Sequence, residues 1–279
     1  MRTTDRIAPE DYEEPRCPLT TPKNDKSAHI VRIPTDRVIE RLDQYLYSRN
    51  TAAAERHLLY WLSEAEAGGD THGRITVTNE LMGLYRNTER RENAYKYAGE
   101  GLKLIEDGGY EGRLVSATTY INAATVYKTF GESDKAYPLY LRAKDIYERE
   151  LDPSDERLGG LYNNMALALA DLGMYDDACG LYRRAIEIMK NTARGGIEAA
   201  ISYLNMANAY EGKLGLEAAA EEIESCLAKA EELLDADKNR RDGYYAYVCD
   251  RCAPTYRYYG YFAYADELGE RSRSIYEGA

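Results

Sequence analysis

The central part of the sequence repeats itself with a period of 42 residues. Laid against itself at this offset, the stretch Asn122–Met189 matches at polar, small and aromatic positions alike. The matching pairs are Asn122/Asn164, Ala124/Ala166, Gly131/Gly173, Ala136/Ala178, Tyr140/Tyr182, Ala143/Ala185 and Ile146/Ile188. A fixed period of this length indicates helical units that bury their apolar faces against one another. We therefore expect a stacked array of helices rather than a single globular core.

Small residues at two positions of each unit indicate a helix hairpin. Ala124 in the first helix and Ala136 in the second let the two axes approach to the usual ~8–10 Å. Gly131 stands between them, where a left-handed residue commonly ends a helix. Asp134 follows in the first turn of the second helix, where a carboxylate interacts favourably with the helix dipole. All four positions have a counterpart 42 residues further on.

This pattern resembles the tetratricopeptide repeat, and within that family the 42-residue form of kinesin light chains. The segments that carry the resemblance are Tyr162-Asn163-Asn164-Met165-Ala166, Ala136-Tyr137-Pro138-Leu139-Tyr140, Arg184-Ala185-Ile186-Glu187-Ile188 and the connector Leu151-Asp152-Pro153-Ser154-Asp155. The resemblance covers residues 71–235 well and the flanks weakly. It implies an all-α, right-handed α-solenoid of about six hairpins whose first helices line a concave groove. Such a fold does not by itself fix an activity.

The chain divides into an N-terminal arm and a repeat domain. Residues 1–33 are acidic, rich in proline and without apolar periodicity, which predicts a flexible arm. The arm is either a dispensable tail or a segment that lies in the protein's own groove or anchors a partner. Residues 34–279 form the helical repeat domain, with units at about 36–69, 71–109, 113–151, 155–193, 196–236 and 242–277. The turn glycine of the second unit is replaced near Glu89.

One asparagine per unit is a candidate for ligand binding. Asn122, Asn164 and Asn205 each stand two residues before a small alanine, and the resemblance places that position on the groove. A side-chain amide donates and accepts together, so it can hold a peptide backbone without reading its sequence. The alternative is that these amides bond to neighbouring helices and fix the superhelical pitch.

Further residues extend the same face along the first helices. They are Thr125, Lys128, Asn208, Arg251, Arg257 and Tyr258. The three basic residues would meet an acidic ligand or a terminal carboxylate, or are simply solvated surface charges. The basic residues of the two-carboxylate clamp of chaperone-binding relatives are missing around Gly160 and Asn164. This argues against a heat-shock tail as the ligand.

The sequence offers little for catalysis. Cys249 and Cys252 form a C-x-x-C, but both fall on the core-facing stripe of a helix, so we expect small buried hydrophobes. A redox or metal site is the alternative, and it would need further ligands. No catalytic triad spacing, phosphate-binding glycine loop or HExxH motif is present. We expect no enzyme activity, no cofactor and no metal.

Composition restricts the partners and the compartment. The net charge of −12 disfavours nucleic acid or an anionic membrane as a partner. No apolar run is long enough to span a bilayer, and the N-terminus lacks a secretory signal. The five cysteines show no disulfide framework, which favours a cytoplasmic protein. Tyrosine outnumbers phenylalanine 27 to 2.

The sequence therefore predicts a non-enzymatic scaffold or adaptor that binds a protein or an extended peptide in its concave groove. The alternative is a peptide-sensing regulatory protein that acts on a separate effector. The C-terminal unit is rich in aromatic residues, which either cap the last apolar face or form a homodimer contact.

Overall fold

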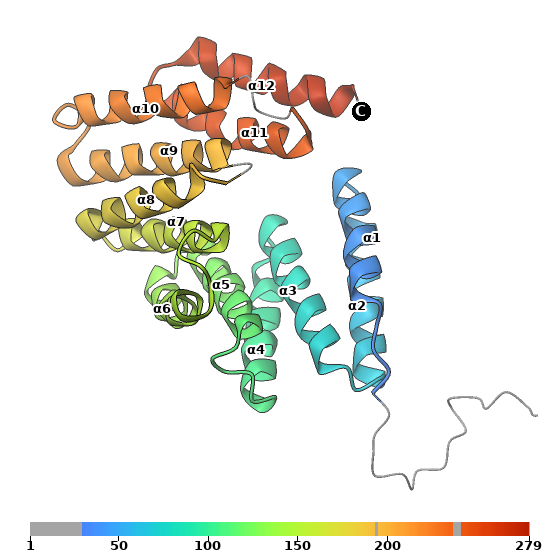
Figure 1. The fold of residues 1–279 in the computed structure, drawn as a ribbon. Helices are drawn as coiled ribbons and strands as arrows, with labels where there is room; N and C mark the ends of the chain where they lie inside the picture. Colours follow the sequence, from blue (N-terminus) through green and yellow to red (C-terminus); the bar gives the residue numbers. More distant parts are fainter. Residues whose placement is uncertain (1–29, 193–194, 237–240, 279) are drawn as a thin grey trace, which may run out of the picture.

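A computed structural model describes residues 30–192, 195–236 and 241–278. Over these residues the chain forms twelve α-helices and no strand, and the helices follow one another as hairpins (Figure 1). The hairpins are α1 (Thr35–Tyr47) with α2 (Thr51–Ala67), α3 (Thr71–Asn87) with α4 (Arg91–Asp107), α5 (Leu114–Thr129) with α6 (Ser133–Glu150), α7 (Glu156–Asp171) with α8 (Tyr175–Met189), α9 (Gly195–Leu214) with α10 (Ala220–Asp235), and α11 (Gly243–Tyr258) with α12 (Phe262–Glu277). The predicted all-α solenoid is confirmed. Residues 1–29, most of the expected arm, lie outside the described residues.

Local signals set where the helices begin. The Asp70 carboxylate accepts a hydrogen bond from the backbone N–H of Gly73 at 3.0 Å and so caps α3. Asp155 caps α7 in the same way, through the N–H of Arg157 at 3.0 Å. Asp242 caps α11. An aspartate before a helix satisfies N–H groups that have no partner within the helix.

The turns within the hairpins use left-handed backbone. Gly131, Gly173, Gly215 and Gly260 have φ values of +81°, +76°, +83° and +88°. Glycine adopts this conformation without a steric cost from Cβ. At the corresponding turn between α3 and α4 the residue is Glu89, with φ +57°. The turn glycine predicted to be replaced in this unit is indeed replaced.

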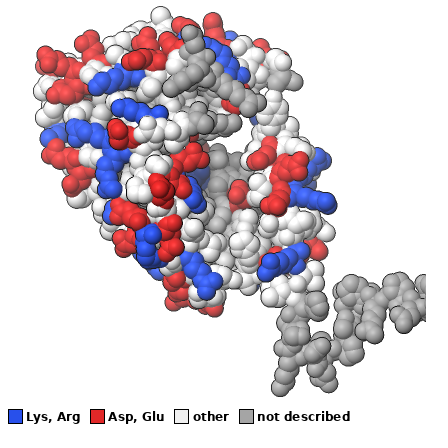
Figure 2. All heavy atoms as spheres, viewed as in Figure 1, with Lys and Arg blue, Asp and Glu red and all other residues white. Residues whose placement is uncertain are grey.

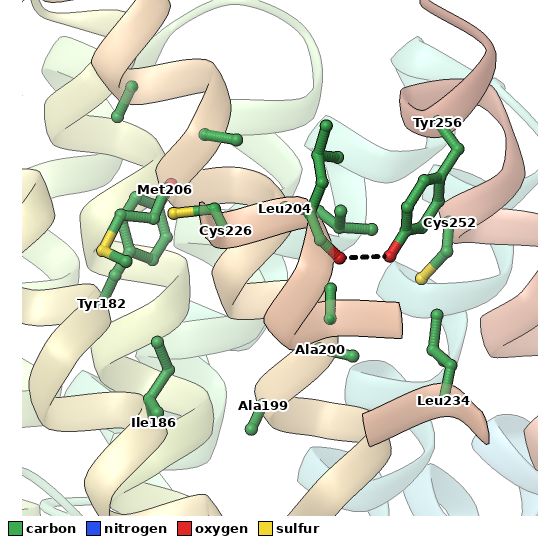
Figure 3. Close-up of a cluster of buried hydrophobic side chains, with 14 of the residues drawn as sticks. Tyr182, Ile186, Ala199, Ala200, Leu204, Met206, Cys226, Leu234, Cys252 and Tyr256 are labelled. Atoms are coloured by element: carbon green, nitrogen blue, oxygen red, sulfur yellow. Dashed lines mark hydrogen bonds between the residues drawn. The ribbon is translucent and has the colours of Figure 1, made fainter. Parts of the chain in front are cut away.

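The core lies between the two helices of each hairpin and between successive hairpins. Ala124, Ala136, Ala166 and Ala178 are fully buried, as the small-residue pattern predicts. Tyr182 of α8 packs beside Met206 of α9 and Cys226 of α10, and Leu204 lies further along the same cluster (Figure 3). In addition, α3 contacts α5, α5 contacts α7, α7 contacts α9 and α9 contacts α11. The first helices from α3 to α11 therefore form a continuous inner layer.

The array curls until its two ends meet (Figure 1). The guanidinium carbon of Arg49, just after α1, lies 4.7 Å from the ring centre of Tyr276 in α12. A Cβ placed on Gly243, at the start of α11, would lie 3.5 Å from the ring of Tyr47 in α1. Figure 2 shows a hollow near the middle of this face of the molecule, with acidic and basic side chains around it. We call the contact between α1 and the α11–α12 hairpin the seam.

Candidate peptide-binding face

Two of the three predicted asparagines have free side-chain amides. Asn122 in α5 and Asn164 in α7 are partly exposed, and neither amide bonds to any described residue. Each stands two residues from a buried alanine that packs against the second helix of its hairpin. Because successive residues turn about 100° around a helix, the amide points away from that second helix. A side chain that lines the concave groove must point away from the second helix, as these two amides do.

The third predicted asparagine is used within the protein. Asn205 Nδ2 in α9 donates to Asn163 Oδ1 in α7 at 3.2 Å. Asn163 Oδ1 also accepts a hydrogen bond from the Ser202 hydroxyl of α9 at 3.0 Å. For Asn205 the structure therefore shows the alternative, a bond that ties neighbouring helices together.

A second asparagine position ties successive first helices, and sequence reasoning did not identify it. Asn79 Nδ2 in α3 donates to the Thr119 hydroxyl of α5 at 3.1 Å. Asn79 lies two periods before Asn163, and both reach the next first helix. The sequence contains two adjacent asparagines here, Asn163 and Asn164, and only Asn164 was predicted to be a functional residue.

The other candidates on α5 have partners within the protein. The Thr125 hydroxyl donates to the Ile121 carbonyl at 2.7 Å and lies 3.0 Å from the Tyr140 hydroxyl. Lys128 Nζ lies 3.7 Å from a carboxylate oxygen of Asp171 in α7. Thr125 thus bonds toward α6, and Lys128 pairs with α7.

The remaining candidates are further along the array and most have partners of their own. Asn208 accepts a hydrogen bond from the Tyr259 hydroxyl at 3.0 Å. The Tyr258 hydroxyl donates to Glu211 at 2.6 Å, and Arg257 pairs with Asp266. Arg251 is exposed on α11. The nine predicted residues therefore do not form a single cluster.

Two charged residues on α3 share the register of the candidate face. Glu80 and Arg86 precede Asn122 and Lys128 by one period of 42 residues. Burial raises the pKa of Glu80, and the nearby Asp43 carboxylate of α1 raises it further. Burial lowers the pKa of Arg86, and Arg251 of α11 adds to this shift. Alignment at the 42-residue offset would have identified both.

The cysteines of the C-x-x-C are buried. Cys249 and Cys252 are free thiols with almost no exposed surface. Burial raises the pKa of both, that of Cys252 to about 12. In the part of the chain that the structure describes, no group of three or more histidine, cysteine or carboxylate side chains is arranged to hold a metal ion.

None of the helices in the described residues has the length and apolar character needed to cross a membrane.

The aromatic residues of the C-terminal hairpin mostly face inward. Tyr245 and Tyr256 are fully buried, and the Tyr245 hydroxyl donates to the Leu234 carbonyl at 3.0 Å. The Tyr256 hydroxyl donates to the Leu227 carbonyl at 2.9 Å (Figure 3). Tyr247, Tyr258 and Phe262 remain exposed. The homodimer alternative stays a prediction.

The repeat that carries Asn164 matches a known sequence family. The sequence model of the tetratricopeptide repeat matches residues 159–193. These residues of the chain are a tetratricopeptide repeat. Among curated proteins, none matches its sequence.

Solved tetratricopeptide-like structures share the fold at low sequence identity. BtubC of P. vanneervenii is 18% identical, with a TM-score of 0.53 over 75% of this chain and 91% of its own. A Podosopora anserina protein assigned as a kinesin light chain, with nearly identical TPR-like repeats, is 17% identical, with a TM-score of 0.50 over 72% of this chain and 94% of its own. A Rap protein complexed with Competence and Sporulation Factor is 14% identical, with a TM-score of 0.50 over 85% of this chain and 73% of its own.

Proposed function

We propose that this tetratricopeptide-repeat protein is a non-enzymatic scaffold that binds an extended segment of a partner protein along its inner face. The observation that carries the proposal is the pair of unpartnered amides of Asn122 and Asn164, which stand one period apart on neighbouring first helices. The complex of the Rap protein, which has a similar fold, gives a precedent for a bound factor.

The chemistry of the face fits a backbone ligand. Each amide can donate one hydrogen bond to a peptide carbonyl and accept one from a peptide N–H. An extended peptide presents both groups at every residue, so two amides at a fixed spacing can hold it in register. Lys128, which is only loosely paired with Asp171, lies on the same helix as Asn122 and would meet an acidic side chain of the ligand.

The cysteine chemistry supports a binding role over a redox or metal role. A thiol acts as a nucleophile or a metal ligand in its thiolate form. Burial disfavours the thiolate at Cys249 and Cys252, which are also remote from Asn122 and Asn164 in sequence.

We assign the whole of residues 34–279 to one repeat domain. We propose that it works in the cytoplasm, where thiols stay reduced.

A double variant tests the proposal. Peptides selected on the wild-type protein by phage display are labelled, and their dissociation constants are measured by fluorescence anisotropy. Asn122→Ala with Asn164→Ala should weaken binding roughly tenfold or more, because each lost hydrogen bond is worth about 0.5–1.5 kcal/mol. Far-UV circular dichroism should show unchanged helicity.

Two control variants make the test specific. Asn93→Ala removes a partly exposed amide on α4, a second helix outside the inner layer, and should leave the affinity unchanged. Asn205→Ala breaks the bond to Asn163 and should lower stability more than affinity. If the double variant binds as tightly as the wild type, the inner-face proposal is wrong.

A further inference from the structure

The seam encloses a cleft that no single repeat contains. Its volume is about 660 Å³, and its walls include Leu46 and Tyr47 from α1, Tyr244 and Tyr247 from α11, and Tyr276 from α12. An adjoining cleft of about 570 Å³ shares Tyr47 and Tyr276. We call these joined spaces the seam cleft. Because its walls come from the first and last hairpins, the site exists only while the array is closed.

Aromatic rings of the seam cleft face solvent. Tyr47 is 60% exposed and Tyr247 is 50% exposed. Their hydroxyls make no hydrogen bond with any described residue, whereas those of the buried Tyr245 and Tyr256 do. The rings of Tyr244 and Tyr247 lie 6.2 Å apart at an angle of 31°. Large exposed apolar groups that converge on one cleft mark an interaction site rather than packing.

The charges around the seam cleft favour a cationic ligand. Its lining contains the carboxylates of Asp43, Asp250 and Glu277. The basic residues that line it are Arg49 and Arg273. The whole chain carries a net charge of −12, which attracts basic partners over longer distances.

The protein itself shows that the seam cleft accepts a guanidinium group. Arg49 lies with its guanidinium carbon 4.7 Å from the ring centre of Tyr276. A cation within about 6 Å of an aromatic ring centre is attracted by the negative face of the ring. Arg49 makes its cation–π contact with the ring of Tyr276. The exposed rings of Tyr47 and Tyr247 make no cation–π contact with any described residue.

We propose that the seam cleft binds an arginine or lysine side chain from a basic peptide segment of a partner. The rings of Tyr47 and Tyr247 receive the cation, and the surrounding carboxylates neutralise it. Because these rings belong to opposite ends of the array, the bound side chain also holds the two ends together. The site is separate from the Asn122 and Asn164 amides, so it does not depend on the function proposed above.

Calorimetric titration with matched peptides tests the charge requirement. The probes are a blocked Gly-Arg-Gly-Arg-Gly peptide and the same peptide with citrulline, which has the shape of arginine without its charge. We expect the arginine peptide to bind at least tenfold more tightly to the full chain. Equal binding of the two peptides, or no arginine-peptide binding at millimolar concentration, would overturn the proposal.

Variants of the two exposed tyrosines test the site. Tyr47→Ala and Tyr247→Ala should each lower the affinity for the arginine peptide about threefold or more, in line with the strength of a cation–π contact. Tyr47→Phe and Tyr247→Phe keep the rings and should bind like the wild type. Tyr60→Ala, which removes an exposed tyrosine of α2 outside the seam cleft, is the matched control.

The result also separates this proposal from the first. The variant with Asn122→Ala and Asn164→Ala should bind the arginine peptide normally. If that variant loses the peptide and the Tyr47→Ala and Tyr247→Ala variants keep it, the cation binds on the inner face and the seam cleft is not a site.

Discussion

Hydroxyl partners explain, for several buried rings, why tyrosine is used in place of phenylalanine. The Arg142 guanidinium of α6 donates to the Tyr120 hydroxyl of α5 at 2.6 Å and stacks on its ring at 4.2 Å. Arg184 and Tyr162 repeat both contacts one period later, at 2.8 and 4.2 Å. The core of each hairpin is thin. A buried tyrosine ring therefore places its hydroxyl at the edge of the core, where a charged side chain can bond to it.

Removing one such hydroxyl should cost stability. The Tyr162 hydroxyl donates to Glu148 at 2.7 Å and accepts from Arg184 at 2.8 Å. Tyr162→Phe should lower the free energy of unfolding by roughly 1–2 kcal/mol, as expected for hydrogen bonds to charged groups. Urea denaturation followed by circular dichroism measures the change, and an unchanged midpoint would contradict it.

The same substitution at another tyrosine should have the opposite effect. Tyr182 is fully buried, and its hydroxyl has no hydrogen-bond partner within the described residues. Burying an unpaired hydroxyl is unfavourable, so Tyr182→Phe should raise the free energy of unfolding by about 1 kcal/mol. The urea midpoint should move upward, and a fall would show that the hydroxyl is bonded in solution.

Glu80 should make stability depend on pH. Its carboxyl pKa is raised above the ordinary 4.5 by burial and by Asp43, so the folded chain holds this proton more tightly than the unfolded chain. Folding is therefore disfavoured as pH rises through the interval from 4.5 to the folded value. Glu80→Gln should be more stable than the wild type at neutral pH, and the gain should vanish toward pH 4.5. Unfolding measured across this range checks it, and a gain that persists at low pH would contradict it.

Sequence periodicity identified the candidate positions but not their partners. It selected Asn122, Asn164 and Asn205 together, because they share a register. In the structure only Asn205 bonds to the neighbouring helix, through Asn163. Which amide reaches its neighbour depends on the angle between successive first helices, and a repeating pattern does not contain that angle.

At the scale of elements, the hairpins could be predicted because their signals are local. The alanines that set the helix spacing and the glycines that close the turns act within one unit. The missing turn glycine was equally predictable, and Glu89 adopts φ +57° where the four later hairpins have glycine. Fold and hairpin order therefore followed from the sequence, whereas contacts between distant hairpins did not.

Restoring glycine at this turn should stabilise the second hairpin. A left-handed backbone costs a non-glycine residue about 1–2 kcal/mol, of which the extra flexibility of unfolded glycine offsets about 0.5–1. Glu89→Gly should thus raise the free energy of unfolding by roughly 0.5–1 kcal/mol. Glu92→Gly, three residues further on inside α4, should lower it by a similar amount. The expectation fails if both variants lose stability in urea denaturation.

At the scale of the whole molecule, closure of the array is a cumulative property. Each hairpin is rotated slightly against the one before, and the rotations add along the solenoid. A small difference at each step decides whether α1 and α12 meet or stay apart, so no single stretch of sequence predicts the seam. The sequence predicted an aromatic-rich C-terminal unit, but not that the rings of Tyr47 and Tyr247 would lie exposed at the seam.

The seam is weak enough to open when its contacts are removed. It depends on the Arg49–Tyr276 contact and on the approach of Tyr47 to Gly243, and an exposed cation–π contact is worth only about 0.5–1 kcal/mol. Arg49→Glu combined with Tyr47→Ala replaces attraction by repulsion from the nearby Asp250 and Glu277. The radius of gyration from small-angle X-ray scattering should increase while helicity stays constant. Tyr60→Ala should leave the radius unchanged, and an unchanged radius in the double variant would mean that packing within the repeats alone sets the curvature.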